Sequence, residues 1–189
     1  MTTLSIHIDT ASALWKKSFT RQRQKIEQAA ALAYLLAKKP RALLAHDTEI
    51  SITLTTDAAL RRLNRDYRHK DKPTNVLSFP QLQLPTHGRK RSNPKPPTAK
   101  DLRIFEQRIL PLGDVVLARQ TIAREAKAQG KTLESHTLHL VVHGVLHLLG
   151  YDHMSAAEAK YMETLECDIL ALMGYNDPYH ANEHKKKTG

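Results

Sequence analysis

Histidine is the residue type whose number and spacing say most about chemistry in this sequence. The chain has 11 histidines among its 189 residues, and several of them fall between positions 136 and 153. His143 and His147 are four residues apart, which places both side chains on one face of a helix, one turn from each other. Gly150 allows the chain to turn after that helix, so His153 can return toward the same face. Three imidazoles can therefore converge on one metal ion.

Three neutral imidazole ligands are typical of zinc, although nickel, copper and cobalt also accept nitrogen ligands. A set of three protein ligands leaves one position for water, which is the arrangement of a catalytic zinc site rather than a structural one. His139 continues the four-residue spacing and Asp152 adjoins His153, so either residue could provide a fourth ligand. We favour His153 as the third ligand and expect His136 and His139 to pack nearby, because a residue that arrives from a turn closes a tetrahedral site more easily.

Composition and charge restrict the kind of substrate. The H-E-x-x-H motif of zinc peptidases is absent, because Gly144 stands where that motif has its catalytic glutamate. The formal net charge is +10, with 29 Lys and Arg against 19 Asp and Glu, and a basic excess of this size favours a polyanionic partner such as RNA over a peptide. A metallohydrolase acting on peptides or small molecules is therefore the weaker alternative.

The single cysteine, Cys167, excludes an internal disulfide framework and fits a reducing compartment. No apolar stretch approaches the roughly 20 residues that a membrane-spanning helix needs, and the first residues do not resemble a secretory signal. These observations predict a cytoplasmic protein with no membrane partner.

Periodicity along the chain predicts the elements that position the histidines. Strands are expected where apolar and polar residues alternate or form short apolar runs, at 4–9, 49–55, 76–79 and 111–117. Helices are expected where apolar residues recur at helical spacing, at 20–39, 58–67, 118–129, 133–149 and 155–173. Asp57 and Ser155 are the expected N-caps of the second and last of these helices.

This order of elements predicts an α+β fold, with residues 1–180 as a single compact domain. Its mixed β-sheet should contain about four strands flanked by helices, and the metal site should lie on a helix of the C-terminal half and the turn that follows. Residues 83–105 are rich in proline and basic side chains, which predicts a flexible surface insertion, and residues 181–189 should form a basic tail.

The segment from His143 to His153, HGVLHLLGYDH, resembles the histidine signature of the YbeY-type endoribonucleases, which are bacterial rRNA maturation factors. Two further segments agree with motifs of that family in the same order: residues 63–80, LNRDYRHKDKPTNVLSFP, and residues 112–115, LGDV. The resemblance covers about residues 48–180, apart from the insertion.

This resemblance implies a zinc ion held by His143, His147 and His153. It also implies single-strand-specific endoribonuclease activity in rRNA maturation, notably at the 16S rRNA 3′ end, and in ribosome quality control, with the small ribosomal subunit as a partner. The family's functional arginine follows the tyrosine of the central motif and corresponds to Arg68. His69 stands where the family usually has glycine, and the insertion is longer and more basic than usual.

The chemistry of Arg68 suits this role, because a planar guanidinium can hold phosphate oxygens and the charge that develops on them. Arg65, Lys70 and Lys72 lie near it in sequence and predict a track for RNA phosphates. Ser78 could add a hydroxyl to the cleft or could be a buried strand residue. The main alternative function is a non-enzymatic ribosome-assembly factor that binds RNA and carries a structural zinc.

Overall fold

The strands follow the alternation of the sequence. The computed structural model describes residues 2–179 except 17, 41–42, 83 and 85–108, so the expected insertion, apart from Leu84, and the expected tail lie outside the described residues. Four strands form one sheet: β1 (Leu4–Thr10), β2 (Asp47–Thr55), β3 (Val76–Pro80) and β4 (Ile109–Ala118). In β2, Ile50, Ile52 and Leu54 are buried, while the residues between them are partly exposed, as expected for a strand with one face on the core.

The sheet is mixed, with the strand order β1-β2-β4-β3. β1 pairs with β2 and β2 pairs with β4 in parallel, whereas β3 pairs with β4 in the antiparallel direction. The antiparallel edge strand β3 and its neighbour β4 both contact the helix that carries the histidines. The predicted α+β fold with a four-stranded mixed sheet is therefore confirmed.

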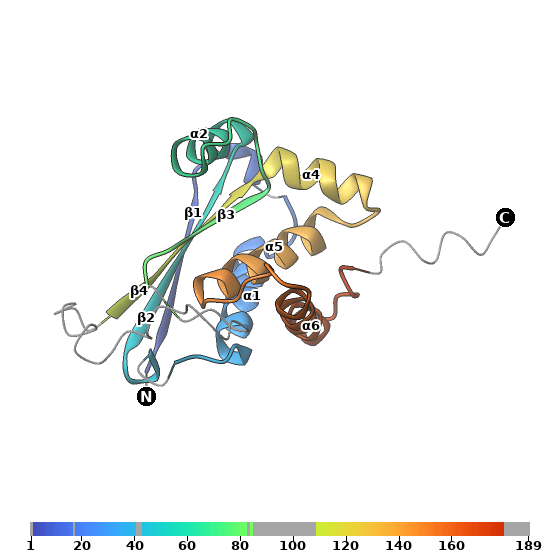
Figure 1. Cartoon of the computed structure of the whole chain (residues 1–189). Coiled ribbons are helices and arrows are strands. Elements are labelled where there is room, and N and C mark those ends of the chain that lie inside the picture. The colour runs from blue at the N-terminus through green and yellow to red at the C-terminus, as the bar shows by residue number, and fades with distance from the viewer. Residues whose placement is uncertain (1, 17, 41–42, 83, 85–108, 180–189) are drawn as a thin grey trace, which may run out of the picture.

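In the part of the chain that the structure describes, five α-helices pack against the sheet or against one another (Figure 1). They are α1 (Gln22–Leu36), α2 (Asp57–Arg68), α4 (Arg119–Ala128), α5 (Leu133–Leu148) and α6 (Ala156–Leu172). Helices α1 and α5 pack on one face of the sheet, and α6 packs against both of them. Helix α5 is buried along most of its length, so the main core surrounds the helix that carries the predicted metal ligands.

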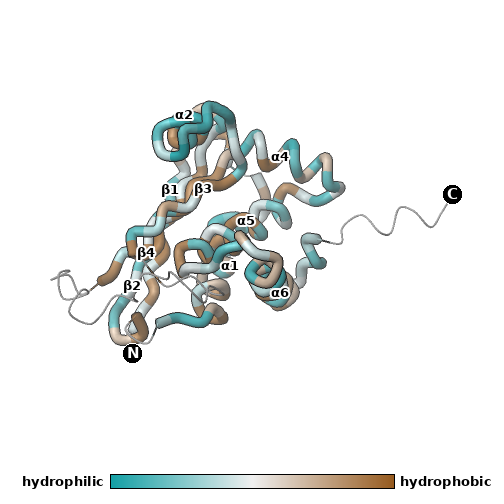
Figure 2. The backbone as a smooth tube through the Cα atoms, in the orientation of Figure 1, coloured by the Kyte–Doolittle hydropathy of each residue, from teal (hydrophilic) through white to brown (hydrophobic). Residues whose placement is uncertain are grey.

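Helix α2 belongs to a second, smaller hydrophobic cluster. Along β4, Val115 and Leu117 face the main core, whereas Val116 packs on the other side of the sheet with Leu60 of α2. The rest of α2 is strongly hydrophilic, as its teal colour in Figure 2 shows. The helix is therefore anchored by a narrow apolar stripe and presents its basic residues outward.

The helix ends show where sequence reasoning succeeded and where it did not. Ser155 caps α6 in a complete capping box with Glu158, as predicted. Asp57 is not the N-cap of α2: the cap is Thr56, whose hydroxyl accepts a hydrogen bond from the amide of Ala59. The Asp57 carboxylate instead accepts a hydrogen bond from the amide of Thr121 at the start of α4.

Helix α1 is shorter than the predicted range of 20–39. Arg21 precedes it with a left-handed φ of 52°, and Ala37 ends it in an extended conformation. Within the part of the chain that the structure describes, no helix combines the length and apolar character needed to cross a membrane.

Candidate metal centre

Helix α5 brings His143 and His147 together, as their spacing predicts. Their Nε2 atoms are 3.1 Å apart. The chain turns at Gly150, which has a φ of 86°, and brings the ring of His153 to 5.7 Å from that of His143 and 5.1 Å from that of His147, measured between ring centroids. Each residue offers one nitrogen, and these three nitrogens lie within 4.8 Å of one another. The three side chains thus form a cluster that could hold a metal ion.

Hydrogen bonds to the other ring nitrogens set the direction of two imidazoles. His147 donates from Nδ1 to the carbonyl oxygen of Tyr151 at 2.9 Å, and His143 donates from Nδ1 to Oε1 of Glu166 at 2.8 Å. In both rings the proton on Nδ1 leaves the lone pair on Nε2, which faces the cluster. Two nitrogens on one tetrahedral zinc at about 2.0–2.1 Å would lie roughly 3.3 Å apart, so the observed 3.1 Å fits such an ion.

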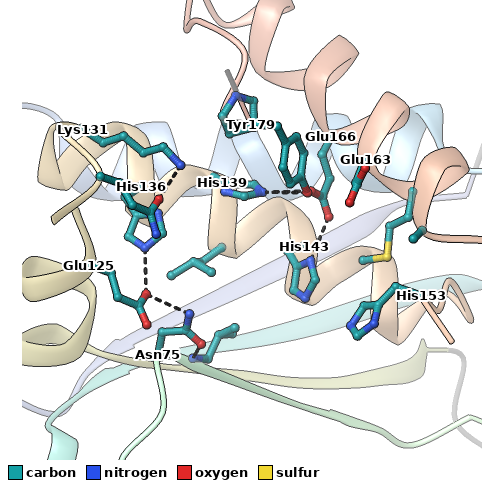
Figure 3. Close-up of a pocket in the computed structure, with 16 residues that line it drawn as sticks. Asn75, Glu125, Lys131, His136, His139, His143, His153, Glu163, Glu166 and Tyr179 are labelled. Carbon is teal, nitrogen blue, oxygen red and sulfur yellow. Dashed lines mark hydrogen bonds and ion pairs between the residues drawn. The ribbon is translucent and has the colours of Figure 1, made fainter. Parts of the chain in front are cut away.

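Glu166 is a residue of this site that sequence reasoning missed. Its carboxylate is buried between two histidines: Oε1 accepts from His143, and Oε2 accepts from Nε2 of His139 at 2.8 Å and from the hydroxyl of Tyr179 (Figure 3). Burial opposes ionisation, but the hydrogen bonds from His139 and His143 outweigh it and lower the pKa of Glu166 to about 2. Glu166 therefore remains an anion that fixes the ring of His143.

A signal for Glu166 was present in the sequence. It lies four residues after Met162 and three before Ile169, on the apolar face of the last helix. A carboxylate on a buried face needs hydrogen-bond donors, and the histidines of the preceding helix supply them.

The electrostatics also suit metal binding. Burial, with the neighbouring His143 and His153, lowers the pKa of His147 to about 4. His147 is therefore neutral near pH 7, and neutral imidazole is the form that binds a metal.

The histidine cluster opens into a cavity of about 710 Å³. Arg68, at the end of α2, lines the same cavity, and its Nη2 makes one long contact of 3.4 Å with the carbonyl oxygen of Ser78. Helix α2 places a cation at this cavity, and α5 with the turn that follows it places the three imidazoles there, although these segments are distant in the sequence.

Comparison with known proteins agrees with this geometry. Residues 13–182 match the family model for endoribonuclease YbeY. The chain belongs to this family. Proteins named endoribonuclease YbeY include one from Paramagnetospirillum magneticum, 44% identical over 94% of this chain and 96% of its own length, and one from Azorhizobium caulinodans, 50% identical over 69% and 70%. A third, from Parvibaculum lavamentivorans, is 41% identical over 95% of this chain and 86% of its own length.

Neither of the other two ligand candidates belongs to the group of side chains that could hold an ion. His139 directs Nε2 to Glu166, and Asp152 accepts a hydrogen bond from the backbone amide of His153 at 2.8 Å. Among the residues that the structure describes, the group able to hold an ion contains the three histidines alone. His136 lies near the start of α5, away from the ligand cluster, where its ring nitrogen contacts Glu125. This arrangement agrees with a three-ligand site, in which a tetrahedral ion keeps one position for water or substrate.

Gly144, which stands at the position of the zinc-peptidase glutamate, lies where helix α5 packs closely on the sheet. A Cβ atom at this position would lie 2.6 Å from a methyl carbon of Val115 and 3.2 Å from the hydroxyl oxygen of Ser78. Helix α5 approaches the sheet so closely here that a side chain larger than that of glycine would require Val115 to shift. The Ser78 hydroxyl donates to the carbonyl oxygen of Gly144 at 3.2 Å and so joins strand to helix.

The residues predicted to bind RNA are exposed, but they are not among the described residues that line the cavity. Arg65 is on α2 and pairs with Asp66 at 2.9 Å, while Lys70 and Lys72 lie exposed in the segment after the helix. His69 ends α2 with a left-handed φ of 55°. This conformation costs a residue with a Cβ atom about 1 kcal/mol, which accounts for a preference for glycine at this turn.

Proposed function

We propose that this chain is a zinc-dependent endoribonuclease that cleaves single-stranded RNA. The observation that carries the proposal is that three convergent imidazoles and Arg68 line one cavity. The three histidines would hold the ion, and a bound Zn²⁺ supplies Lewis acidity and a water of lowered pKa. The names of the YbeY relatives support an RNA substrate, and the basic net charge supports binding of a polyanion.

The chain's own groups would orient the ligands and bind the phosphate. The Glu166 carboxylate and the Tyr151 carbonyl oxygen fix the orientations of the His143 and His147 rings, respectively. Among the described residues Arg68 makes one long hydrogen-bond contact, so its guanidinium can donate to the oxygens of a scissile phosphate and stabilise the negative charge that grows on them. The cavity volume of about 710 Å³ is in the range of pockets for a single small ligand, which fits an unpaired nucleotide rather than a duplex.

We further propose 16S rRNA as the cellular substrate, at its 3′ end, with the small ribosomal subunit as the partner and the cytoplasm as the location. The support is membership of the YbeY family together with the exposed basic residues on and just after α2, Arg65, Lys70 and Lys72, which would contact phosphates. Incubation of the zinc-loaded protein with a 16S 3′-end precursor transcript tests this choice, because cleavage should map to the mature end rather than to scattered positions.

The test of the activity compares three variants for zinc content and for cleavage of a single-stranded RNA. Arg68→Ala should keep zinc and lose roughly 100-fold or more in rate, because it removes a donor to the developing charge. Arg62→Ala is the matched control, since Arg62 is exposed on the same helix and does not line the cavity. His147→Ala should lose zinc and cleavage together.

Two results would contradict the proposal. Equal cleavage rates for Arg68→Ala and Arg62→Ala would show that Arg68 takes no part in the reaction. Zinc-loaded wild-type protein that binds RNA in a salt-dependent manner without cleaving it would support the alternative, an RNA-binding assembly factor with a structural zinc.

A further inference from the structure

A second cavity, of about 580 Å³, lies beside the histidine cluster and is called here the Glu125 cavity (Figure 3). Besides Glu125, its wall includes Asn75, Lys131, His136, Glu163 and Tyr179. His143 and His153 line both this cavity and the one that contains Arg68. A strand of RNA that crosses the metal centre can therefore place neighbouring groups in the two cavities.

Glu125 presents a fixed hydrogen-bond acceptor to this cavity. Its Oε2 accepts from Nδ2 of Asn75 and from Nε2 of His136, both at 2.9 Å. Within the described residues Oε1 accepts no hydrogen bond, and the side chain is 33% exposed. Burial opposes ionisation, but the hydrogen bonds from His136 and Asn75 outweigh it and lower the pKa of Glu125. The carboxylate is therefore ionised and can only accept hydrogen bonds.

The charges around the Glu125 cavity favour a neutral group over a phosphate. Glu125, Glu163 and Glu166 all line it, and Lys131 is the one lysine or arginine among its described lining residues. The cavity on the other side contains Arg68. Phosphate oxygens should therefore lie toward Arg68, and an uncharged base toward Glu125.

A second metal ion is not the favoured occupant of this cavity. In the described part of the chain, the histidine triad is the one group with three ligand atoms close enough together for an ion. The carboxylates of the Glu125 cavity are not gathered in that way, and Oε2 of Glu125 already accepts two hydrogen bonds.

We propose that the Glu125 cavity is a nucleobase subsite in which Oε1 of Glu125 accepts a hydrogen bond from the exocyclic amino group of a base. Cytosine, adenine and guanine carry such a group, whereas uracil presents a carbonyl oxygen where cytosine has its amino group. The position of this base, next to the scissile phosphate, rests on the proposed nuclease function. The selection of an amino group rests on Glu125 and its two donors alone.

Binding of short RNA measures this selection without cleavage. We expect the wild-type protein to bind a cytidine pentamer roughly tenfold more tightly than a uridine pentamer in fluorescence anisotropy. The reason is that cytidine can donate a hydrogen bond to the Glu125 carboxylate where uridine presents a second acceptor. In Glu125→Gln, Asn75 and His136 retain the amide oxygen, so the amide NH₂ faces the cavity as a donor. The preference should then move toward uridine.

Glu163→Gln is the matched control, because it removes the same charge from the same cavity without changing the fixed acceptor. It should keep the preference for cytidine. A second comparison uses the wild-type protein alone and changes the RNA. It compares an adenosine pentamer with a purine-riboside pentamer, which has the same ring system without the amino group. The second should bind the wild-type protein roughly tenfold more weakly.

The outcomes separate this proposal from the nuclease proposal. Wild-type binding that does not distinguish cytidine from uridine, or adenosine from purine riboside, would overturn the subsite even if the protein cleaves RNA. A preference that reverses in Glu125→Gln and persists in Glu163→Gln would support the subsite even if no cleavage were found.

Discussion

The contact between Glu166 and His143 can be tested by one small substitution. Glu166→Gln keeps the size of the side chain but replaces one carboxylate oxygen by NH₂. One of the two histidines that now donate to Glu166 would then face a donor. If His143 loses its acceptor, its ring is no longer fixed with Nε2 toward the other ligands.

Glu166→Gln should weaken metal binding and should also lower the stability of the metal-free protein. Removal of such a partner from a metal-ligating histidine weakens metal binding about 10–100-fold, which corresponds to about 1.4–2.7 kcal/mol. Because Glu166 is fully buried, the mismatched hydrogen bond should also lower the free energy of unfolding of the metal-free protein by about 1–3 kcal/mol.

Zinc affinity is measured by competition with a chromophoric chelator, and stability by urea unfolding of the metal-free protein. Glu163→Gln is the control, because Glu163 is exposed on the same helix and should change neither quantity substantially. If Glu166→Gln folds and binds zinc within twofold of the wild-type affinity, the prediction that the full carboxylate of Glu166 is needed to orient His143 is wrong.

Two further predictions concern the protonation of His147 and the packing of Gly144. The pKa of His147 is about 4 in the folded protein and 6.5 for an ordinary histidine. As the pH falls below 6.5, the unfolded chain therefore binds a proton at His147 before the folded protein does. The metal-free protein should lose about 2–3 kcal/mol of unfolding free energy between pH 7.5 and 4.5, and His147→Ala should show a smaller loss over that range. An equal loss in both would show that His147 is not responsible. Gly144→Ala should lower the unfolding free energy by about 1–3 kcal/mol through contact with Val115, and a urea midpoint equal to that of the wild type would contradict this.

The ligand cluster could be predicted because it is local in sequence. His143 and His147 share one helix, and His153 follows a glycine that ends it, so helical geometry alone predicts that the three converge. The strands could be predicted for the same reason, since alternation along β2 matches its burial residue by residue.

Features that depend on distant segments could not be predicted in this way. Asp57 has the right type and position for an N-cap, but tertiary packing places its carboxylate against the start of α4. Glu125 and Asn75 are far apart in sequence and meet only when β3 and α4 pack near α5. Arg68 was expected to act with the histidines because of a family resemblance, and only the packing of α2 beside the sheet places it at their cavity.

The order of the elements along the chain also affects when the centre is complete. The carboxylate that aligns His143 comes from the last described helix, and Tyr179, which also donates to it, follows that helix. During synthesis the three histidines are therefore added to the chain before the carboxylate that fixes one of them. A chain truncated before Glu166 would contain all three ligands without the carboxylate that orients His143, and we expect it to bind metal more weakly than the longer chain.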